Sequence, residues 1–511
     1  MLNKVVNLGG LFAAKSEHPL ADARELRRVV ADLPRDNAFK ALDEITGWFE
    51  SLAAVEDFPA DRLYDVVQAL DDAAQPHLTR LTREYLHTAR LSRSEEKRLW
   101  SINFGFWTLL SASYERCLFG LPGKPRSGEM APATLSTLAV RALGALGNIV
   151  KWEQFRYGPM ANGIWLRMGG ILLAADDAGV GGKPVTLPGR SGISSPDQEY
   201  EKAMIFQAAS LGSLLPVEIE IAERLIAHFL AGFVFTERAQ IDSVYWSDLA
   251  LAQAPMRLAR MPAQATRTQR FLKPGAAFES MQAILDQIER GGDMPPEIDL
   301  GAQYNPRVLI RVLRHLTAYL APIPPQRKHD RHRVKHRMAV MNGLVNAYVA
   351  FSGEFGGRPP GLPVESWVVD NVSRGGFGAS LSNISGEWVK VGALIAMQPE
   401  GGDNWLLGVV RRYQRDSESE ARVGIQTIAT RATAAELRVR TSSSYAAVAG
   451  IPALLLGDGN EPGEMRVVLP AGTFSPRESM EYGSAGQRQV LMPVAIAEQA
   501  DDYEVARYRL S

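Results

Sequence analysis

The sequence predicts a multidomain α + β protein, with a large N-terminal all-α domain, a small antiparallel β-barrel, and a C-terminal β extension or second small β domain. Three observations support this fold class. Apolar residues recur at helical spacing as far as Leu320, a proline cluster follows at Pro322, Pro324 and Pro325, and beyond it the apolar period changes to two. The predicted domains are 1–321, a proline-rich linker at 322–326, 327–440 and 441–511.

The composition is typical of a globular protein. Hydrophobic residues make up 46% of the 511 positions and charged residues 22%, both ordinary values. The net charge of −1 gives no global basic field of the kind that nucleic-acid binders often show. Cys117 is the only cysteine, which excludes an intrachain disulfide framework and a cysteine-based zinc cluster.

We expect a cytoplasmic protein. The apolar patch Val5–Ala14 is interrupted by Asn7 and lacks a convincing cleavage site, so it does not resemble a secretory signal. The longest uncharged apolar run, Ser101–Tyr114, is shorter than the roughly 18 residues that a membrane-spanning helix requires.

Helices are predicted along the whole N-terminal domain. The aromatic residues of Glu96–Phe119 are dense enough for burial on more than one face, which favours core packing over a ligand pocket. Ser195, followed by Pro196 and Gln198, is typical of a helix start. Helix pairs stacked into a bundle or solenoid would fit the pattern. The predicted helical ranges are Asp36–Phe119, Ala131–Asp176, Ser195–Leu211, Pro216–Arg238, Ala276–Arg290 and Arg307–Leu320, with breaks near 120–131 and 177–195.

The helical region offers no catalytic constellation. Its loop Gly179–Pro184 is glycine-rich, but it lacks the first glycine of a phosphate loop and has Pro184 where Mg²⁺ binding requires Ser or Thr. The histidines are scattered along the chain, at His18, His77, His87, His228 and His315. An enzyme housed in this region is therefore only an alternative, which a cleft with convergent carboxylates would support.

The second half of the chain is predicted to form strands separated by glycine-rich turns, as in a small antiparallel barrel. The clearest strands of its first part are Ala347–Phe351, Trp367–Val369, Trp405–Val410 and Val423–Ile428. Beyond residue 441 the clearest strands are Met465–Leu469 and Gln489–Ile496.

Two segments of this half indicate a site for a nucleotide anion. Arg327–Arg337 carries six cationic side chains and one carboxylate. Guanidinium groups held close together suit phosphate oxygens and the Hoogsteen edge of guanine. The second segment, Asp370–Gly376, follows the strand predicted at Trp367. Its Asn and Ser favour a turn, and its glycines allow a ligand to approach the backbone closely.

These two segments resemble the signature of the PilZ family, bacterial receptors for the second messenger cyclic di-GMP. The motif Arg-x-x-x-Arg is matched by Arg327–Arg331, and (Asp/Asn)-x-Ser-x-x-Gly is matched by Asn371–Gly376. Arg333–Arg337 has the same spacing as the first motif, so this second pair stays open, although a strand that has begun by Val334 favours the first. The resemblance covers residues 325–435.

The resemblance implies a binding switch without catalysis, a cofactor or a metal. Its ligand would be cyclic di-GMP, and the predicted binding residues are Arg327, Lys328, Arg331, Arg333, Asn371, Ser373 and Gly376. Because the arginines adjoin the proline linker, ligand binding is expected to reorient the helical domain and thereby signal to a protein partner.

Three other interpretations of the basic run stay open. His329, His332 and His336 would share one face of a helix and could hold zinc, but the neighbouring arginines would repel the cation. Nucleic acid would use the same cations, but the run contains no aromatic stacking partner. A scaffold protein with a degenerate barrel is the third alternative, and a titration with cyclic di-GMP distinguishes it from a receptor.

Overall fold

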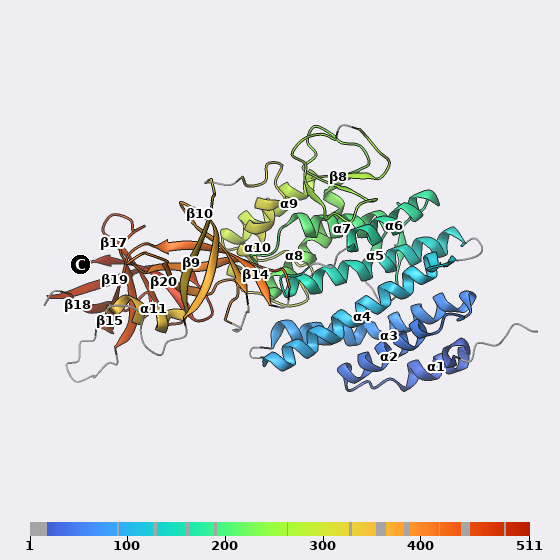
Figure 1. Cartoon of the computed structure of the whole chain (residues 1–511), viewed down its shortest axis with the longest axis horizontal. Coiled ribbons are helices and arrows are strands. Elements are labelled where there is room, and N and C mark those ends of the chain that lie inside the picture. The colour runs from blue at the N-terminus through green and yellow to red at the C-terminus, as the bar shows by residue number, and fades with distance from the viewer. Residues whose placement is uncertain are drawn as a thin grey trace, which may run out of the picture. The chain divides into compact units, whose positions relative to one another are not determined.

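The structure is a computed structural model that describes residues 18–511 except 89–90, 126–129, 160–162, 189–191, 263, 327–329, 354–363, 383–387, 418, 441–449 and 485–486. Contacts divide the chain into two units. Unit 1 contains Met1–Arg156, Met160–Leu211 and Pro216–Pro325, and unit 2 contains Tyr157–Pro159, Gly212–Leu215 and Gln326–Ser511. Unit 1 is mainly helical and unit 2 is mainly built from strands, which confirms the α + β fold class (Figure 1).

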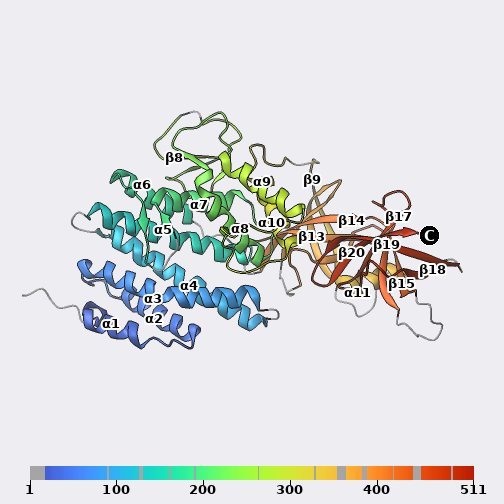
Figure 2. The ribbon, with the colours of Figure 1, turned by 180° about the vertical axis from the view of Figure 1, so that it is seen from behind.

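The long helices of unit 1 pack against their sequence neighbours. Helices α2, α3, α4 and α5 lie side by side in both views (Figures 1 and 2). The helices are α1 (Ala23–Asp32), α2 (Ala38–Ala54), α3 (Ala60–His87), α4 (Arg93–Phe119), α5 (Pro132–Phe155), α6 (Ile164–Asp177), α7 (Pro196–Ala208), α8 (Pro216–Phe229), α9 (Gly275–Glu289) and α10 (Pro306–Tyr319), with 3₁₀ turns η2 (Pro19–Ala21) and η3 (Leu230–Gly232). Two short strand pairs join helices, β1 (Gly120–Leu121) with β2 (Lys124–Pro125) and β3 (Val185–Thr186) with β4 (Ile193–Ser194).

Local sequence signals set several of these helices. The predicted start of α7 is confirmed, because the hydroxyl of Ser195 accepts a hydrogen bond from the N–H of Gln198 at 3.2 Å. The aromatic side chains Phe106 and Trp107 of α4 are buried in the core. Among the described residues, α5 is the one helix long and apolar enough to cross a membrane by length and composition, and 67% of its apolar window is buried inside the protein.

A buried ion pair joins three of the helices. Nη1 of Arg141 on α5 lies 2.6 Å from Oδ2 of Asp71 on α3, and both side chains are fully buried. The hydroxyl of Tyr114 on α4 donates to the same carboxylate oxygen at 2.6 Å. Burial raises the pKa of Tyr114 well above its ordinary value, so the phenol stays a neutral donor. Each buried charge therefore has a partner inside the core.

Unit 1 also contains a four-stranded sheet that the sequence analysis missed. Its order is β5–β8–β6–β7, with β5 at Val234–Thr236, β6 at Tyr245–Asp248, β7 at Met256–Arg257 and β8 at Gln269–Lys273. The helix predicted over 216–238 is wrong at its C-terminal end, because α8 ends at Phe229 and the chain then pairs with β8. Gly232 allows the close approach that follows, since a Cβ there would lie 2.8 Å from the backbone nitrogen of Ala277. Distant pairing therefore overrides the local helical pattern.

Glu201 is a buried carboxyl group on α7 whose charge is poorly compensated. Only 7% of the residue is exposed, and its Oε1 accepts no hydrogen bond from the residues that the structure describes. Burial, together with the negative charge of Asp197, raises the pKa of Glu201 from 4.5 to about 8. The folded chain therefore holds a proton here that the unfolded chain releases at lower pH.

Because of this carboxyl group, the free energy of unfolding of unit 1 should fall as the pH rises from 4.5 to about 8. In this range the unfolded state binds fewer protons than the folded state. Glu201→Gln keeps the shape of the protonated carboxyl group and removes this dependence. At the upper end of the range the variant should be more stable than wild type by up to about 4 kcal/mol. Chemical denaturation followed by circular dichroism measures both profiles, and parallel profiles would contradict the prediction.

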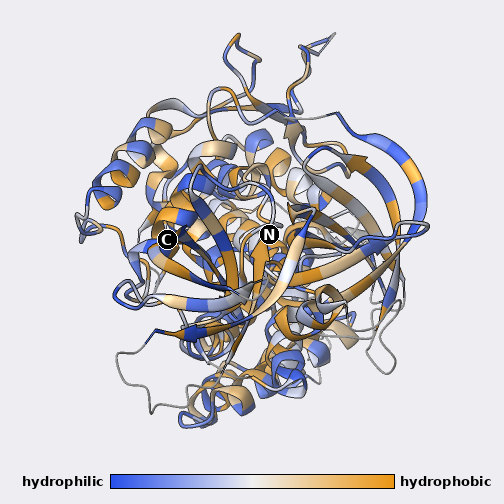
Figure 3. Cartoon of the chain, turned by 90° about the vertical axis from the view of Figure 1, so that its left-hand side faces the viewer, coloured by the Kyte–Doolittle hydropathy of each residue, from blue (hydrophilic) through white to orange (hydrophobic). Residues whose placement is uncertain are grey.

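The first barrel of unit 2 is closed and antiparallel, in the order β10–β11–β14–β13–β12–β9. Exposed and buried residues alternate along its strand at residues 420–429, and hydrophobic and hydrophilic residues alternate along strands that face the viewer in Figure 3. The strands predicted at Trp367–Val369 and Val423–Ile428 lie within β10 and β14 and are confirmed. The strands are β9 (His332–Asn342), β10 (Glu365–Ser373), β11 (Gly376–Ser382), β12 (Leu394–Pro399), β13 (Leu406–Arg415) and β14 (Glu420–Ala429).

One predicted strand of this barrel is wrong, because Ala347–Phe351 belongs to the helix α11 (Gly343–Ser352). Its β-branched and aromatic residues favour a strand locally, but Leu344 and Ala347 bury one helical face in the core of unit 2. The helix ends at Gly353, whose φ of +67° is typical of a left-handed cap. Tertiary packing therefore decides the conformation of this segment.

The C-terminal region is a second closed barrel rather than an extension. Its order is β15–β16–β17–β20–β19–β18, and β18 pairs with β15 to close it. When the strands are numbered one to six within each barrel, both barrels have the neighbour order 2-3-6-5-4-1. The strands are β15 (Ala432–Val439), β16 (Ile451–Leu456), β17 (Glu464–Pro470), β18 (Met480–Ser484), β19 (Gln487–Gln499) and β20 (Tyr503–Leu510).

The two barrels share one hydrophobic core. Leu407 and Val409 of the first barrel belong to the same buried cluster as Leu454 and Val468 of the second, with Leu344 of α11. A common core of this kind holds the barrels together inside unit 2.

Candidate functional site

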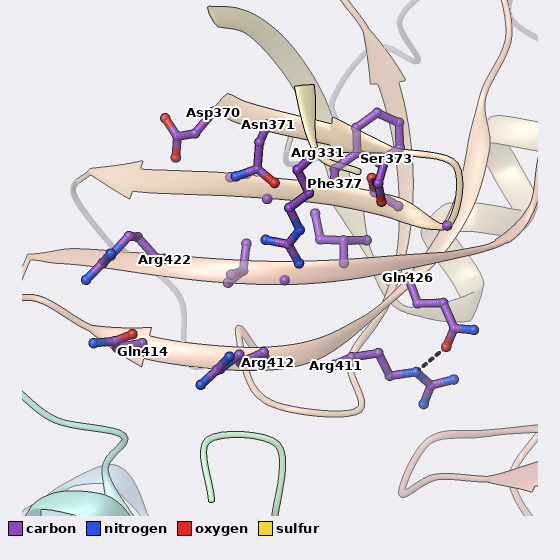
Figure 4. A pocket seen from close by; sticks show the side chains of 17 residues that line it. Arg331, Asp370, Asn371, Ser373, Phe377, Arg411, Arg412, Gln414, Arg422 and Gln426 are labelled. Atoms are coloured by element: carbon purple, nitrogen blue, oxygen red, sulfur yellow. Dashed lines mark hydrogen bonds between the residues drawn. The ribbon is translucent and has the colours of Figure 1, made fainter. Parts of the chain in front are cut away.

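A pocket of about 520 Å³ lies on the outer face of the first barrel, over β10, β11, β13 and β14 (Figure 4). Four guanidinium groups and one carboxylate line it, together with amide and hydroxyl side chains. A concave polar surface with an excess of positive charge suits an anionic ligand. Its polar side chains are Arg331, Asp370, Asn371, Ser373, Arg411, Arg412, Gln414, Arg422 and Gln426.

The residues on either side of the turn in the hairpin β10–β11 form one wall of the pocket. The register of β10 shifts between Val369 and Asn371, so Asp370 is the extra residue of a bulge. Asn371 pairs with Gly378 on β11, and a Cβ on Gly378 would lie 2.5 Å from Nδ2 of Asn371. The amide of Asn371 therefore occupies the space that the missing side chain of Gly378 leaves in the wall.

The turn of the hairpin brings the chain close to β14. The hydroxyl of Ser373 donates to the carbonyl oxygen of Gly376 at 3.3 Å. Gly376 has a φ of +154°, and a Cβ there would lie 1.9 Å from the carbonyl oxygen of Ile425. A side chain at this position would push β11 away from β14, so the geometry of this pocket edge requires glycine.

Arg331 immediately precedes β9, and its guanidinium group points into the pocket (Figure 4). The side chain makes no hydrogen bond or ion pair with any residue that the structure describes. The carboxylate in the lining, Asp370, instead accepts a hydrogen bond from the hydroxyl of Ser380. The guanidinium group of Arg331 is thus available for the oxygens of an anion.

Strands β13 and β14 supply three guanidinium groups that the sequence analysis missed, from Arg411, Arg412 and Arg422. Arg422 forms a bidentate pair with Asp416 at 2.8 and 2.6 Å, and this hydrogen bonding raises its pKa. Burial lowers the pKa of Arg411, but hydrogen bonds and the charge of Glu498 raise it overall. Arg411 and Arg422 therefore stay charged, and each is paired with a carboxylate.

The sequence contained a signal for part of this wall. Val423 and Ile425 are buried inside the barrel, so the residues that alternate with them, Arg422 and Gln426, face outward. The alternation could have indicated an outward-facing arginine on this strand. Sequence alone could not show that the strand lies beside the Asn371 hairpin, because that depends on the closed strand order.

The structure brings four of the predicted residues to this pocket: Arg331, Asn371, Ser373 and Gly376. Arg327 and Lys328 lie outside the described residues. Arg333 is paired with Asn371 across β9 and β10 but does not line the pocket.

The structure also places residues of the alternative arginine pair and of the zinc alternative. Arg337 lies outside the pocket, where its Nη1 donates to the hydroxyl of Ser366 at 3.3 Å. His329 is outside the described residues, whereas His332 and His336 lie on the strand β9, so the helical face required for zinc is not formed. Within the described part of the chain, no cluster of metal-ligating side chains is found.

Comparison with known families concerns the other unit. Residues 24–239 match the family model described as the N-terminal domain of the cyclic-di-GMP receptor FimW. Over this range the chain is similar to a family of cyclic-di-GMP receptors. No curated protein matches the chain.

Proposed function

We propose that this chain is a cytoplasmic receptor for cyclic di-GMP and that the first barrel is a PilZ-like domain whose outer pocket binds the nucleotide. The observation that carries the proposal is the convergence of Arg331, Asn371, Ser373 and Gly376 on one pocket. Residues of both motif segments meet there, although Arg331 and Asn371 are far apart in the sequence. Arg327 and Lys328, which precede Arg331 in the sequence, complete the proposed set of contacts, whereas Arg333 lies on β9 outside the pocket lining.

A second observation supports the same ligand from a different part of the chain. The family match to a cyclic-di-GMP receptor covers residues 24–239, whereas the pocket is built from residues after 330. The two indications therefore use different residues. They favour a receptor over a scaffold with a degenerate barrel, and over an enzyme in the helical unit.

The chemistry of the pocket fits a cyclic dinucleotide. Its phosphates suit guanidinium groups, and those of Arg331 and Arg412 belong to the pocket lining. The guanine edges require donors and acceptors such as the side chains of Asn371 and Gln414. In this proposal, ligand contact with the arginines that follow Pro325 alters how the helical unit is presented to a protein partner.

Arg331→Ala is expected to weaken binding of cyclic di-GMP by about 2 kcal/mol or more, which is about thirtyfold. The variant removes a guanidinium group that points into the pocket and has no partner among the described residues. Isothermal titration calorimetry on the full chain measures the affinity. Circular dichroism should show that the variant is folded, because the side chain is exposed.

Arg337→Ala is the matched control, because it removes the same charge from β9 outside the pocket. Its affinity should stay within about twofold of wild type, as is usual for a distant surface charge. The opposite result, with Arg337→Ala inactive and Arg331→Ala unchanged, would transfer the site to the second arginine pair. A wild-type chain that gives no binding heat would refute the receptor.

A further inference from the structure

One pocket residue is tied to the second barrel. Arg411 is the extra residue of a bulge in β13, where the register shifts between Val410 and Arg412. Its Nη1 and Nη2 donate to the two carboxylate oxygens of Glu498 at 2.7 and 2.6 Å. Glu498 lies on β19, and it also accepts a hydrogen bond from the hydroxyl of Tyr503 at 3.0 Å.

The hydrogen bonds of Arg411 occupy both edges with which a guanidinium group binds an anion. The terminal edge, formed by Nη1 and Nη2, faces Glu498. On the side edge, Nε donates to Oε1 of Gln426 at 2.8 Å (Figure 4). Arginine binds phosphate most strongly through two parallel N–H donors. Arg411 therefore cannot give a phosphate a bidentate contact until one of these partners is released.

We propose that Glu498 of the second barrel competes with the bound nucleotide for Arg411 and thereby sets the affinity of the pocket. This inference rests on the proposed function, because the competitor is the anionic ligand of that pocket. The same guanidinium group serves two anions, of which one belongs to the ligand and the other to β19. Ligand binding is then coupled to the contact between the barrels, and the second barrel acts as a regulator of the first.

Electrostatics gives the direction of the effect. Glu498 is 28% exposed and Arg411 is 38% exposed, so their pair is only partly screened by water. A carboxylate beside a pocket opposes a phosphate both by repulsion and by neutralising the arginine. Removing the charge of Glu498 while keeping its shape should therefore strengthen nucleotide binding, and the gain should require Arg411.

A double-mutant cycle on the full chain tests the proposal by calorimetric titration with cyclic di-GMP. Glu498→Gln is expected to bind about three to ten times more tightly than wild type, the scale of a partly exposed ion pair. In the Arg411→Ala background the same substitution should change the affinity by less than about twofold. Glutamine can still accept the hydrogen bond from Tyr503, so the fold of β19 should be kept.

The control is Glu481→Gln on β18, which removes a carboxylate of the second barrel whose partner, Arg488, does not line the pocket. This variant should bind like wild type. Equal or weaker binding by Glu498→Gln would overturn the competition, as would a gain that persists without Arg411 or that Glu481→Gln reproduces. If wild type binds cyclic di-GMP, these results overturn the competition but not the proposed receptor function. A wild type that does not bind overturns both proposals.

Discussion

Replacing Gly376 by valine is expected to abolish binding of cyclic di-GMP and to lower the free energy of unfolding of unit 2 by about 2 kcal/mol or more. A Cβ at this position would lie 1.9 Å from the carbonyl oxygen of Ile425, and the φ of +154° disfavours a branched side chain. The hairpin must then move away from β14, which removes a wall of the pocket. Calorimetric titration and thermal unfolding measure the two effects.

A substitution at a second glycine distinguishes an effect on ligand affinity from an effect on stability. Gly378→Ala would place a Cβ 2.5 Å from Nδ2 of Asn371, the mobile end of a side chain, so this amide should be displaced while the strand remains paired. We expect weaker binding and a nearly unchanged melting temperature. Gly483→Val on β18, where a Cβ would meet no atom of the described residues within 4 Å, is the control for a valine in a strand. Normal affinity in both Gly376→Val and Gly378→Ala would exclude the hairpin from the site.

The second large effect concerns stability in unit 1. Arg141→Ala should lower the free energy of unfolding by about 3 to 5 kcal/mol, because it leaves the carboxylate of Asp71 buried without its cation. Tyr114 and Gln75 still donate to that carboxylate, but neutral donors do not replace a charge. Urea denaturation followed by circular dichroism measures the loss.

Two further variants show whether the unpaired charge is the cause. Arg141→Met combined with Asp71→Asn leaves no ion in the core and should recover part of the stability that Arg141→Ala loses. Arg62→Ala breaks an ion pair with Asp65 on the surface of α3 and should cost less than about 1 kcal/mol. A loss of similar size in Arg62→Ala and Arg141→Ala would mean that burial of the pair is unimportant.

The sequence predicted much of the site because its signals are local. An Asn-x-Ser-x-x-Gly segment between alternating strands specifies a tight hairpin through the turn preferences of its own residues. That hairpin is present at β10–β11, and Arg331 precedes the strand β9 as its spacing indicated. Which arginine pair binds the ligand is still a prediction for the variants above to test.

The errors lie where distant residues decide the conformation. The apolar pattern after Phe229 continues that of a helix, but Val234–Thr236 pairs with β8, which is more than thirty residues away. The segment Ala347–Phe351 has local strand preference, but its helical face packs into the core that both barrels share. Local propensity is a weak term, about 1 kcal/mol or less per residue, and burial outweighs it in both places.

By itself, the sequence determined the order of a helical half, a proline break and a strand-rich half, together with the hairpin that carries Asn371, Ser373 and Gly376. These follow from apolar periodicity and turn chemistry, which depend on neighbouring residues. Only the tertiary structure decided that β13 and β14 add Arg411, Arg412 and Arg422 to the pocket region, and that Glu498 reaches Arg411 from the second barrel. Barrel closure creates these contacts between residues far apart in the chain, and no local pattern encodes which strands become neighbours.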